Sequence, residues 1–286
     1  MAHSVRLTIG GIVLTVEGGE SVNLLMQLPG MSLFASNDFA KPEVRVLLDV
    51  PLAEPECRWL HSHPLQVLTE RCRFGIDTEG VYHYDFGGMS RLRFDPKVPD
   101  EVRISPLTDP MLLRYVLWVA YAMVGLWRGV LPIHSSVVVC GKGAVLCLGE
   151  SGTGKSTHTA LWIKHIEGTY LLNDDGPVVR CDSDGVWAYG SPWSGKSPCF
   201  RTEQQPVAAF LRLEQRKSNS IRRLGSVEAL TALLPSCPPP LAHDEATMDR
   251  VVDYVGLAVS HVPVYRMGCL PDADAARLSY QTIMQS

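Results

Sequence analysis

The stretch GESGTGKS at residues 149–156 constrains the fold more than any other part of the chain. It satisfies the pattern G-x-x-x-x-G-K-[ST] in full. The apolar run AVLCL precedes it and a helix is predicted over 155–165, so the expected strand and helix flank the loop. Glycines let successive N–H groups face inward, and the helix presents its positive end to the same anion. The segment predicts a phosphate-binding loop, with a structural glycine turn as the alternative.

Two side chains of this loop carry specific chemistry. Lys155 has the reach to contact the β- and γ-phosphates of a nucleotide, and the Ser156 hydroxyl suits a position on Mg²⁺. The rest of the loop is expected to surround the phosphates. The predicted nucleotide-binding residues are Gly149, Glu150, Ser151, Gly152, Thr153, Gly154, Lys155, Ser156 and Thr157.

A pair of adjacent acids, Asp174 and Asp175, follows in the sequence NDDG. The pair comes after a predicted strand, Tyr170 to Leu172, which we expect to run parallel to the strand that enters the loop. Ligands collect beyond the carboxyl ends of such strands, which places the pair beside the phosphates. Adjacent residues of an extended chain point opposite ways, so one acid is expected to hold the metal and the other to accept a proton. Which acid does which stays open, and an Asp-Gly turn that caps the strand is the alternative.

His134 is a third candidate for the same site. A predicted hairpin, SSVVVCGKGAVLCL, separates it from Gly149, and two arms of similar length return His134 to the end where the loop begins. A neutral imidazole there is suited to binding a divalent metal or exchanging a proton near pH 7. A histidine at a strand edge with a local hydrogen bond is the alternative.

Composition limits the partners and the compartment. The chain of 286 residues has a net charge of −4 with both signs scattered, which disfavours nucleic acid and anionic membranes as partners. The uncharged run Tyr115 to Trp127 covers 13 residues, whereas a bilayer span takes about 20. Eight cysteines without a C-x-x-C pair predict reduced thiols. With no secretory signature at the N-terminus, a cytoplasmic protein is predicted.

The first hundred residues differ in texture from the rest of the chain. Short alternating runs separated by turns predict a β-rich N-terminal subdomain over residues 1–108. Asp109 and Pro110 then provide an N-cap and a first helical position for a buried apolar helix. A second domain, which contains the phosphate loop, is predicted over residues 109–286.

Two other groups of side chains have a functional and an ordinary interpretation. His61 and His63 lie on one side of an extended segment, but no third ligand is spaced to join them, and a solvated pair competes with a metal site. A polar turn further along the chain is either a solvated hairpin or a surface for an acidic partner. Its basic residues are Arg212, Arg216, Lys217, Arg222 and Arg223.

The order histidine, hairpin, phosphate loop, helix, Asp-Asp over about residues 134–176 resembles the core shared by HPr kinase/phosphorylases and phosphoenolpyruvate carboxykinases. The resemblance implies an α/β fold with a mixed sheet for this P-loop core, and it does not extend to the β-rich N-terminal subdomain. It implies ATP and Mg²⁺ as cofactors. It also assigns phosphate and metal contacts to Lys155 and Ser156, a metal contact or general base to Asp174 and Asp175, and the family histidine's role to His134.

The chain also departs from both families. The additional arginines and the metal-binding lysine of carboxykinases have no evident counterpart. HPr kinases carry an arginine- and glycine-containing loop after the Asp pair, where this chain has GSPWSGKSPCFR. Lys196 or Arg201 of this segment either assists phosphoryl transfer or is a solvated side chain. The altered segment leaves the acceptor unidentified.

These features predict an ATP- and Mg²⁺-dependent kinase that transfers the γ-phosphate to a hydroxyl of a small molecule, peptide or protein. Catalysis is assigned to Asp174, Asp175, His134 and Lys155, and metal binding to Ser156 and the two acids. A non-catalytic nucleotide-binding regulatory module and a phosphoenolpyruvate carboxykinase-like lyase are the alternatives. The sequence leaves open whether ATP, ADP or pyrophosphate is the donor, and a homo-oligomer is compatible with the resemblance.

Overall fold

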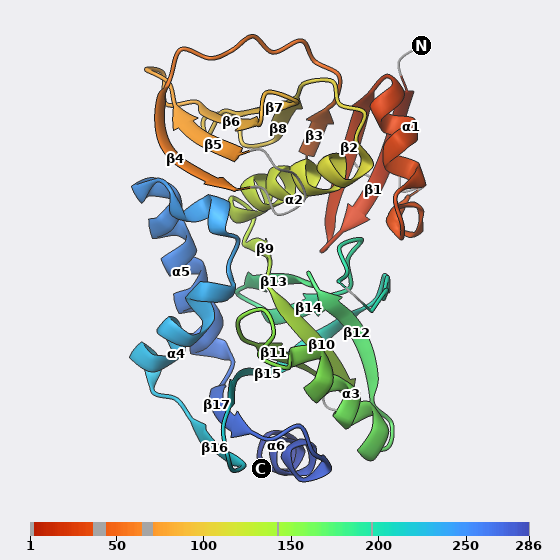
Figure 1. The fold of residues 1–286 in the computed structure, drawn as a ribbon, viewed down its shortest axis with the longest axis vertical. Coiled ribbons are helices and arrows are strands. Elements are labelled where there is room, and N and C mark those ends of the chain that lie inside the picture. The colour runs from red at the N-terminus through yellow and green to blue at the C-terminus, as the bar shows by residue number, and fades with distance from the viewer. Residues whose placement is uncertain (1–2, 37–43, 65–70, 142, 196, 286) are drawn as a thin grey trace. The chain divides into compact units, whose positions relative to one another are not determined.

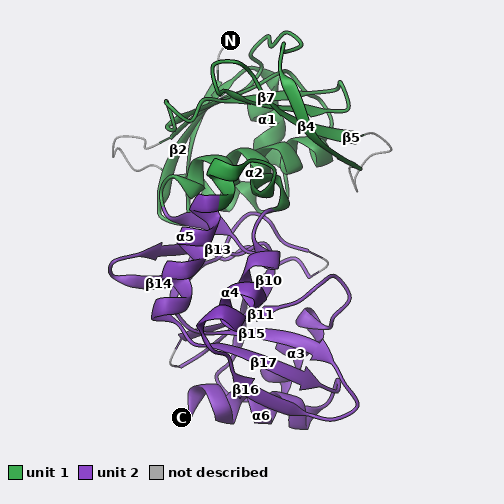
Figure 2. Ribbon diagram, turned by 90° about the vertical axis from the view of Figure 1, so that its left-hand side faces the viewer, with its two compact units in different colours: residues 1–128, 239–248 green, residues 129–238, 249–286 purple. Residues whose placement is uncertain are grey.

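The structure, a computed structural model, describes residues 3–36, 44–64, 71–141, 143–195 and 197–285. The chain divides into two units (Figure 2). Unit 1 comprises Met1–Arg128 and Pro239–Met248, and unit 2 comprises Gly129–Pro238 and Asp249–Ser286. The division differs from the predicted ranges 1–108 and 109–286, because the apolar helix and a short later segment pack with the N-terminal strands.

Unit 1 is built on a sheet whose described strands follow the order β1-β2-β3-β8-β7-β6-β5-β4. Both neighbours of β3 run parallel to it, and the other pairs are antiparallel. The strands are β1 (His3–Ile9), β2 (Ile12–Gly18), β3 (Val44–Leu47), β4 (Arg58–Pro64), β5 (Arg71–Ile76), β6 (Tyr82–Phe86), β7 (Arg91–Phe94) and β8 (Glu101–Ile104). The helical elements are α1 (Glu20–Gln27), η1 (Met31–Phe34), α2 (Pro110–Leu126) and η3 (Pro239–Ala242).

Local sequence explains the main features of unit 1. Gly10 and Gly11 both have positive φ, as a two-residue hairpin turn between β1 and β2 requires. Asp109 caps α2 by accepting a 2.7 Å hydrogen bond from the Leu112 N–H, and Pro110 takes the first helical position. The buried side of α2 covers the sheet (Figure 1). Among the described residues, no helix has both the length and the apolar character to cross a bilayer.

Unit 2 contains a mixed sheet whose described strands follow the order β12-β10-β11-β15-β14-β13-β9, with β17 paired to β15 and β16 paired to β17. β11, β15 and β17 are parallel, whereas β10 is antiparallel to both β11 and β12. The strands are β9 (Val130–Pro132), β10 (Ser135–Cys140), β11 (Gly143–Leu148), β12 (Tyr170–Asp175), β13 (Val178–Asp182), β14 (Gly185–Tyr189), β15 (Gln204–Gln215), β16 (Ser220–Arg223) and β17 (Val264–Cys269). The predicted mixed α/β architecture is confirmed.

Helices α3 (Lys155–His165) and α6 (Ala273–Met284) pack together on the sheet of unit 2 (Figure 1). Trp162 is fully buried between them, and its Nε1 donates a 2.8 Å hydrogen bond to Ser279 Oγ. His158 Nε2 lies 3.0 Å from the same hydroxyl. The sequence analysis did not predict α6. The remaining helical elements are α4 (Ser226–Leu233), η2 (Leu234–Ser236) and α5 (Glu245–His261).

Candidate functional site

Strand pairing brings the predicted site residues together at the carboxyl ends of β11 and β12. Ser135, the first residue of β10, pairs with Leu148 at the end of β11 and with Asp175 at the end of β12. His134 therefore precedes a residue that lies between the phosphate loop and the Asp pair. Because β10 is antiparallel to both neighbours, β12 runs in the same direction as β11, as predicted, with β10 between them.

The glycine-rich loop is shaped by its own residues. Gly152 and Gly154 have φ values of 81° and 107°, which side chains other than glycine rarely adopt. Thr153 Oγ1 donates a 2.7 Å hydrogen bond to the Glu150 carbonyl and closes the turn. Helix α3 begins at Lys155, and its N-cap, Gly154, offers no side-chain hydrogen bond. The positive end of α3 thus opens at the loop without a side-chain cap.

Lys155 points into the loop. Its side chain is buried, and Nζ donates hydrogen bonds to the carbonyl oxygens of Gly149 at 2.8 Å and Glu150 at 3.2 Å. Burial lowers the pKa of Lys155, while the carboxylates of Asp175 and Glu150 oppose that shift. The loop therefore holds an ammonium group at its centre.

The other loop residues lie around this centre. Ser151, Gly152 and Thr157 are exposed, and Thr153 is partly exposed. The Glu150 carboxylate is exposed as well, and Arg212 Nη2 lies 2.8 Å from its Oε1. Gln215 Nε2 donates a 3.1 Å hydrogen bond to the Gly152 carbonyl. The end of β15 thus holds two parts of the loop from outside.

The two acids have opposite environments, as alternation along a strand predicts. Asp174 is 3% exposed, and its Oδ1 accepts a 2.8 Å hydrogen bond from Ser156 Oγ. The Asp175 side chain is 57% exposed, and its Oδ1 lies 3.3 Å from His134 Nε2. Asp174 thus contacts the serine of the phosphate loop, and Asp175 contacts the histidine.

The backbone of Asp175 adopts an uncommon conformation, with φ at 99°. A bridge to Ser194 holds it from one side, and the Gly195 N–H donates a 2.7 Å hydrogen bond to the Asp174 carbonyl. A Cβ atom at Gly195 would lie 2.9 Å from the Asp175 Cβ. The segment after β14 is therefore packed directly on the Asp pair.

Asn173 is a positioning residue that sequence reasoning missed. It is fully buried, and its Nδ2 lies within hydrogen-bond distance of the Ser191, Trp193 and Cys199 carbonyls and of Ser191 Oγ, at 3.1–3.4 Å. Its Oδ1 accepts a 3.1 Å hydrogen bond from the Gly176 N–H. One amide thus holds Ser191, Trp193 and Cys199 against the end of β12. The NDDG quartet was the available signal, because an asparagine between an apolar strand and two acids has polar groups to satisfy.

The two predicted cations of this segment have different outcomes. Lys196 lies outside the described residues. Arg201 Nε donates a 2.8 Å hydrogen bond to the Leu171 carbonyl, its Nη1 lies 3.3 Å from Glu203 Oε1, and the guanidinium covers the Tyr170 ring. Tyr170 and Leu171 belong to the first half of β12, and Glu203 directly precedes β15, so Arg201 is engaged away from the Asp pair.

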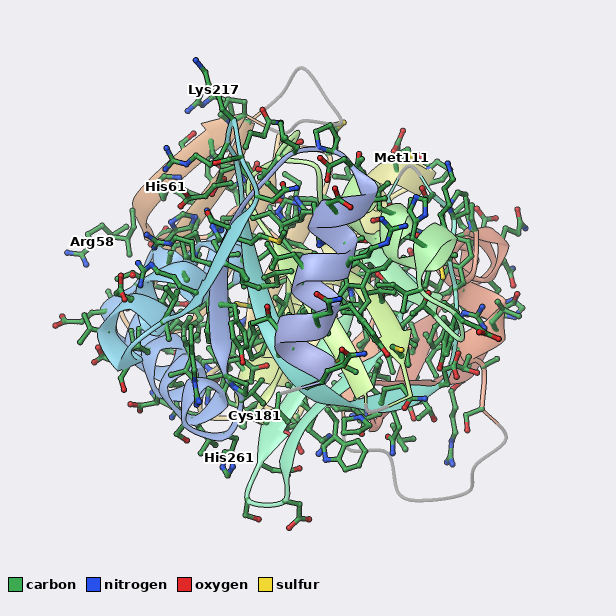
Figure 3. The ribbon with its side chains drawn as sticks, turned by 90° about the horizontal axis from the view of Figure 1, so that it is seen from below. Arg58, His61, Met111, Cys181, Lys217 and His261 are labelled. Carbon is green, nitrogen blue, oxygen red and sulfur yellow. The ribbon has the colours of Figure 1, made fainter. Side chains whose placement is uncertain are left out.

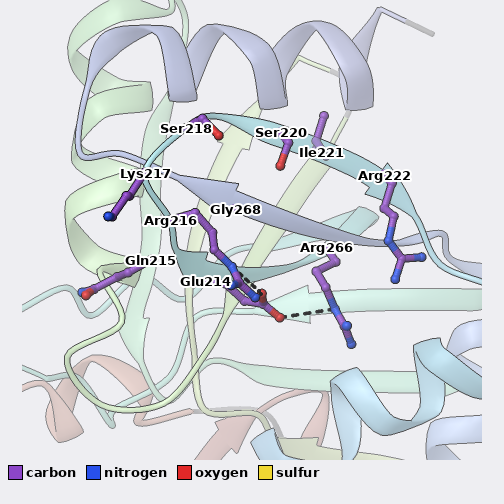
Figure 4. Close-up of a pocket in the computed structure, with 10 residues that line it drawn as sticks. All are labelled: Glu214, Gln215, Arg216, Lys217, Ser218, Ser220, Ile221, Arg222, Arg266 and Gly268. Carbon is purple, nitrogen blue, oxygen red and sulfur yellow. Dashed lines mark hydrogen bonds and ion pairs between the residues drawn. The ribbon is translucent and has the colours of Figure 1, made fainter.

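A cavity of about 830 Å³ is lined by the end of β15, the turn after it, and residues of β16 and β17 (Figure 4). Gln215, which bonds to the loop, lines it. Four cations and one acid also line it: Arg216, Lys217, Arg222, Arg266 and Glu214. Several members of the predicted basic turn have acidic neighbours, since Glu214 lies 2.8 Å from Arg216, and Glu228 lies 2.6 Å from Arg222. The cavity nevertheless has more positive than negative side chains.

Comparisons with known proteins give similarities to solved structures but no family match. No protein-family model matches the chain, and no curated protein matches it. Among solved structures, the Hpr(Ser) kinase/phosphatase from Coxiella burnetii is similar to this chain with a TM-score of 0.32 and 14% sequence identity. The match covers 54% of this chain and 88% of that structure.

Proposed function

We propose that the chain is a Mg²⁺- and ATP-dependent kinase with an HPr kinase-like core, which transfers the γ-phosphate to a hydroxyl group of a small molecule, peptide or protein. The observation on which the proposal rests is that the two acids of the Asp pair have different partners. Buried Asp174 bonds to the loop residue Ser156, and exposed Asp175 adjoins His134. Holding a nucleotide requires the first arrangement but not the second.

The side chains at the loop fit a metal-bound nucleotide. The uncapped start of α3 and the Lys155 ammonium provide the positive groups that phosphates need. Ser156 Oγ and Asp174 Oδ1 are adjacent oxygen ligands of the kind that Mg²⁺ prefers. When bound, Mg²⁺ offsets the charge on the phosphate oxygens. Ser156 and Asp174 would hold it.

Asp175 is assigned as the general base. Its carboxylate is accessible to an acceptor, and His134 beside it restricts its orientation. The acceptor hydroxyl transfers its proton to Asp175 as its oxygen bonds to the γ-phosphorus, the bond from phosphorus to the β–γ bridging oxygen breaks, and ADP leaves. Lys155 and the loop N–H groups stabilise the charge that develops on the phosphoryl oxygens.

The strained backbone of Asp175 supports a catalytic rather than a purely structural role. Residues with positive φ other than glycine cost free energy and collect at functional sites. Here the packing of Gly195 and the bridge to Ser194 maintain the conformation.

The cationic cavity supports an assignment for the acceptor. It adjoins the loop through Gln215, which lines the cavity and bonds to the Gly152 carbonyl. Its excess of positive side chains favours an acceptor that carries an anionic group in addition to its hydroxyl. Of the two interpretations of the basic turn, this assignment favours a surface for an acidic partner.

The test compares the wild-type chain with Asp175→Asn in a cell extract that contains Mg²⁺ and ATP labelled at the γ-phosphate. Asparagine tolerates positive φ as aspartate does, so the variant removes the base without changing the backbone requirement. Asp184→Asn, in the exposed turn between β13 and β14, is the matched control. We expect the wild type and the control to label an acceptor.

Loss of a general base lowers the rate by about 10²–10⁴-fold, so labelling by Asp175→Asn should fall to near background. A wild-type chain that binds ATP but labels nothing would favour the regulatory module. Equal labelling by Asp175→Asn would remove Asp175 from the mechanism. Decarboxylation of oxaloacetate with nucleotide consumption would instead favour the carboxykinase-like lyase.

A further inference from the structure

Three histidines of unit 1 converge although the sequence places only two of them together. His61 and His63 belong to β4, and His243 directly follows η3. One ligand nitrogen from each ring lies within 4.8 Å of the other two. The His61 and His243 rings are stacked with centroids 3.8 Å apart, and the His63 ring centroid lies 6.0 Å from that of His243. The fold thus brings His243 to the histidine pair as a third possible metal ligand.

Strand geometry explains the first two positions. Residues two apart on a strand share a face, and His61 and His63 pair across β5 with Phe74 and Cys72, which are both buried. The His243 ring lies 5.9 Å from the Phe74 ring. All three imidazoles therefore gather over the apolar residues of β5.

Hydrogen bonds from β6 fix the third position. Tyr84 Oη donates to the Pro240 carbonyl at 2.9 Å, before His243 in the chain. Tyr82 Oη donates to Asp244 Oδ2 at 2.8 Å, immediately after it. The two tyrosines thus hold Pro240, before His243, and Asp244, after it. A metal ligand that is preorganised needs such a rigid support.

One nitrogen of the cluster lacks the partner that burial demands. His243 Nε2 is buried and has no hydrogen bond within the described part of the chain. An unsatisfied buried polar atom costs about 1–3 kcal/mol, and an absent ion is one of its recognised explanations. The His243 ring therefore has a buried nitrogen available to a ligand.

We propose that His61, His63 and His243 form a Zn²⁺ site that joins β4 to the segment 239–248. Three imidazoles suit zinc, which binds nitrogen ligands and accepts three protein ligands with a fourth position for water. Zn–N bonds of about 2.1 Å put tetrahedral ligand nitrogens roughly 3.4 Å apart, and the three nitrogens here already lie within 4.8 Å of one another, so only small adjustments are needed. Exposed His61 on the edge strand β4 has the freedom for such adjustments (Figure 3).

A neighbouring phenol adds to the site. Tyr115 Oη of α2 lies 3.5 Å from His63 Nε2. Ligand histidines commonly have such a polar neighbour, which orients the ring. The site would therefore connect α2, β4 and the later segment, all within unit 1, and it is independent of the proposed kinase activity.

The experiment titrates the untagged, chelator-treated full chain with ZnCl₂ by calorimetry. His61→Ala removes an exposed ligand, and His261→Ala, which removes an exposed histidine from the end of α5, is the matched control (Figure 3). We expect one Zn²⁺ per chain for the wild type and the control. His61→Ala should bind more than about 10-fold more weakly.

Thermal unfolding provides the second readout, because a ligand that binds only the folded state raises the melting temperature. Zn²⁺ should raise it for the wild type and His261→Ala but much less for His61→Ala and His243→Gln. Circular dichroism of the metal-free variants verifies that they fold. The proposal is overturned if the wild type binds no Zn²⁺, or if His61→Ala and His261→Ala bind it with the same affinity.

Discussion

Ser156 Oγ lies 2.8 Å from Asp174 Oδ1, although 18 positions separate the two residues in the chain. The hydroxyl belongs to the first turn of α3 and the carboxylate to the end of β12, so the contact joins the phosphate loop to the Asp pair. It is the structural basis for assigning the metal to Asp174 and the base to Asp175.

Ser156→Ala should weaken Mg²⁺-dependent nucleotide binding and reduce stability. The buried Asp174 carboxylate loses a hydrogen-bond donor, which costs about 1–3 kcal/mol. Calorimetric titration with Mg-ATP and urea unfolding measure the two effects. Ser151→Ala changes an exposed serine of the same loop and should alter neither quantity by much. Identical nucleotide affinity for the two variants would contradict the metal assignment.

Asn173→Asp should destabilise unit 2 and abolish transfer together. The substitution removes both N–H donors and places a carboxyl group among three carbonyl oxygens, at a cost of about 3 kcal/mol or more. Urea unfolding and the phosphate-transfer assay measure the outcome. Asn23→Asp, at an exposed position of α1, is the control and should stay within about 0.5 kcal/mol of the wild type. A stable, active Asn173→Asp protein would show that segment 191–199 does not depend on this amide.

Acid should weaken the packing of α3 against α6. Burial lowers the pKa of His158 to about 4, against about 6.5 in the unfolded chain. The folded pKa is the lower one, so this contribution is fully present above pH 6.5 and is lost as the pH falls toward 4. Between pH 7 and pH 5 the loss is about 2 kcal/mol.

Urea unfolding at the two pH values, in the wild type and in His158→Gln, measures this loss. The variant lowers overall stability by disturbing the contacts with Trp162 and Ser279, but its pH dependence should be smaller by that amount. His243 also has a lowered pKa, and its contribution is common to both proteins and cancels. Equal pH dependence in the two proteins would contradict a neutral, buried His158.

Local patterns predicted the secondary structure around Lys155. The strand, loop and helix around Lys155 are contiguous in sequence, so short-range rules suffice, and α3 has the predicted bounds. Alternation along an extended chain predicted the different environments of Asp174 and Asp175. The strand itself was predicted to end at Leu172, and asparagine and aspartate do have low strand propensity. Pairing with β10 extends it to Asp175, since tertiary contacts override propensity.

Residues that depend on distant segments escaped prediction. Asn173 acquires its partners from the segment 191–199, and His243 joins His61 and His63 only after both chain segments have folded. For the same reason, the sequence showed no third ligand for a metal site at His61 and His63, since His243 is distant in the chain. Which acid adjoins Ser156 likewise required the register between β10 and β12.

The most direct test of the central claim is a calorimetric titration of Mg-ATP into the wild type, Lys155→Met and Asp175→Asn. Lys155 supplies the ammonium within the loop, whereas Asp175 is assigned as the base for the acceptor hydroxyl. Replacing Lys155 should therefore weaken Mg-ATP binding more than replacing Asp175. We predict saturable binding to the wild type, binding to Asp175→Asn within about 3-fold of it, and a loss of more than about 10-fold for Lys155→Met. No binding to the wild type, or unchanged affinity in Lys155→Met, would contradict a nucleotide site at this loop.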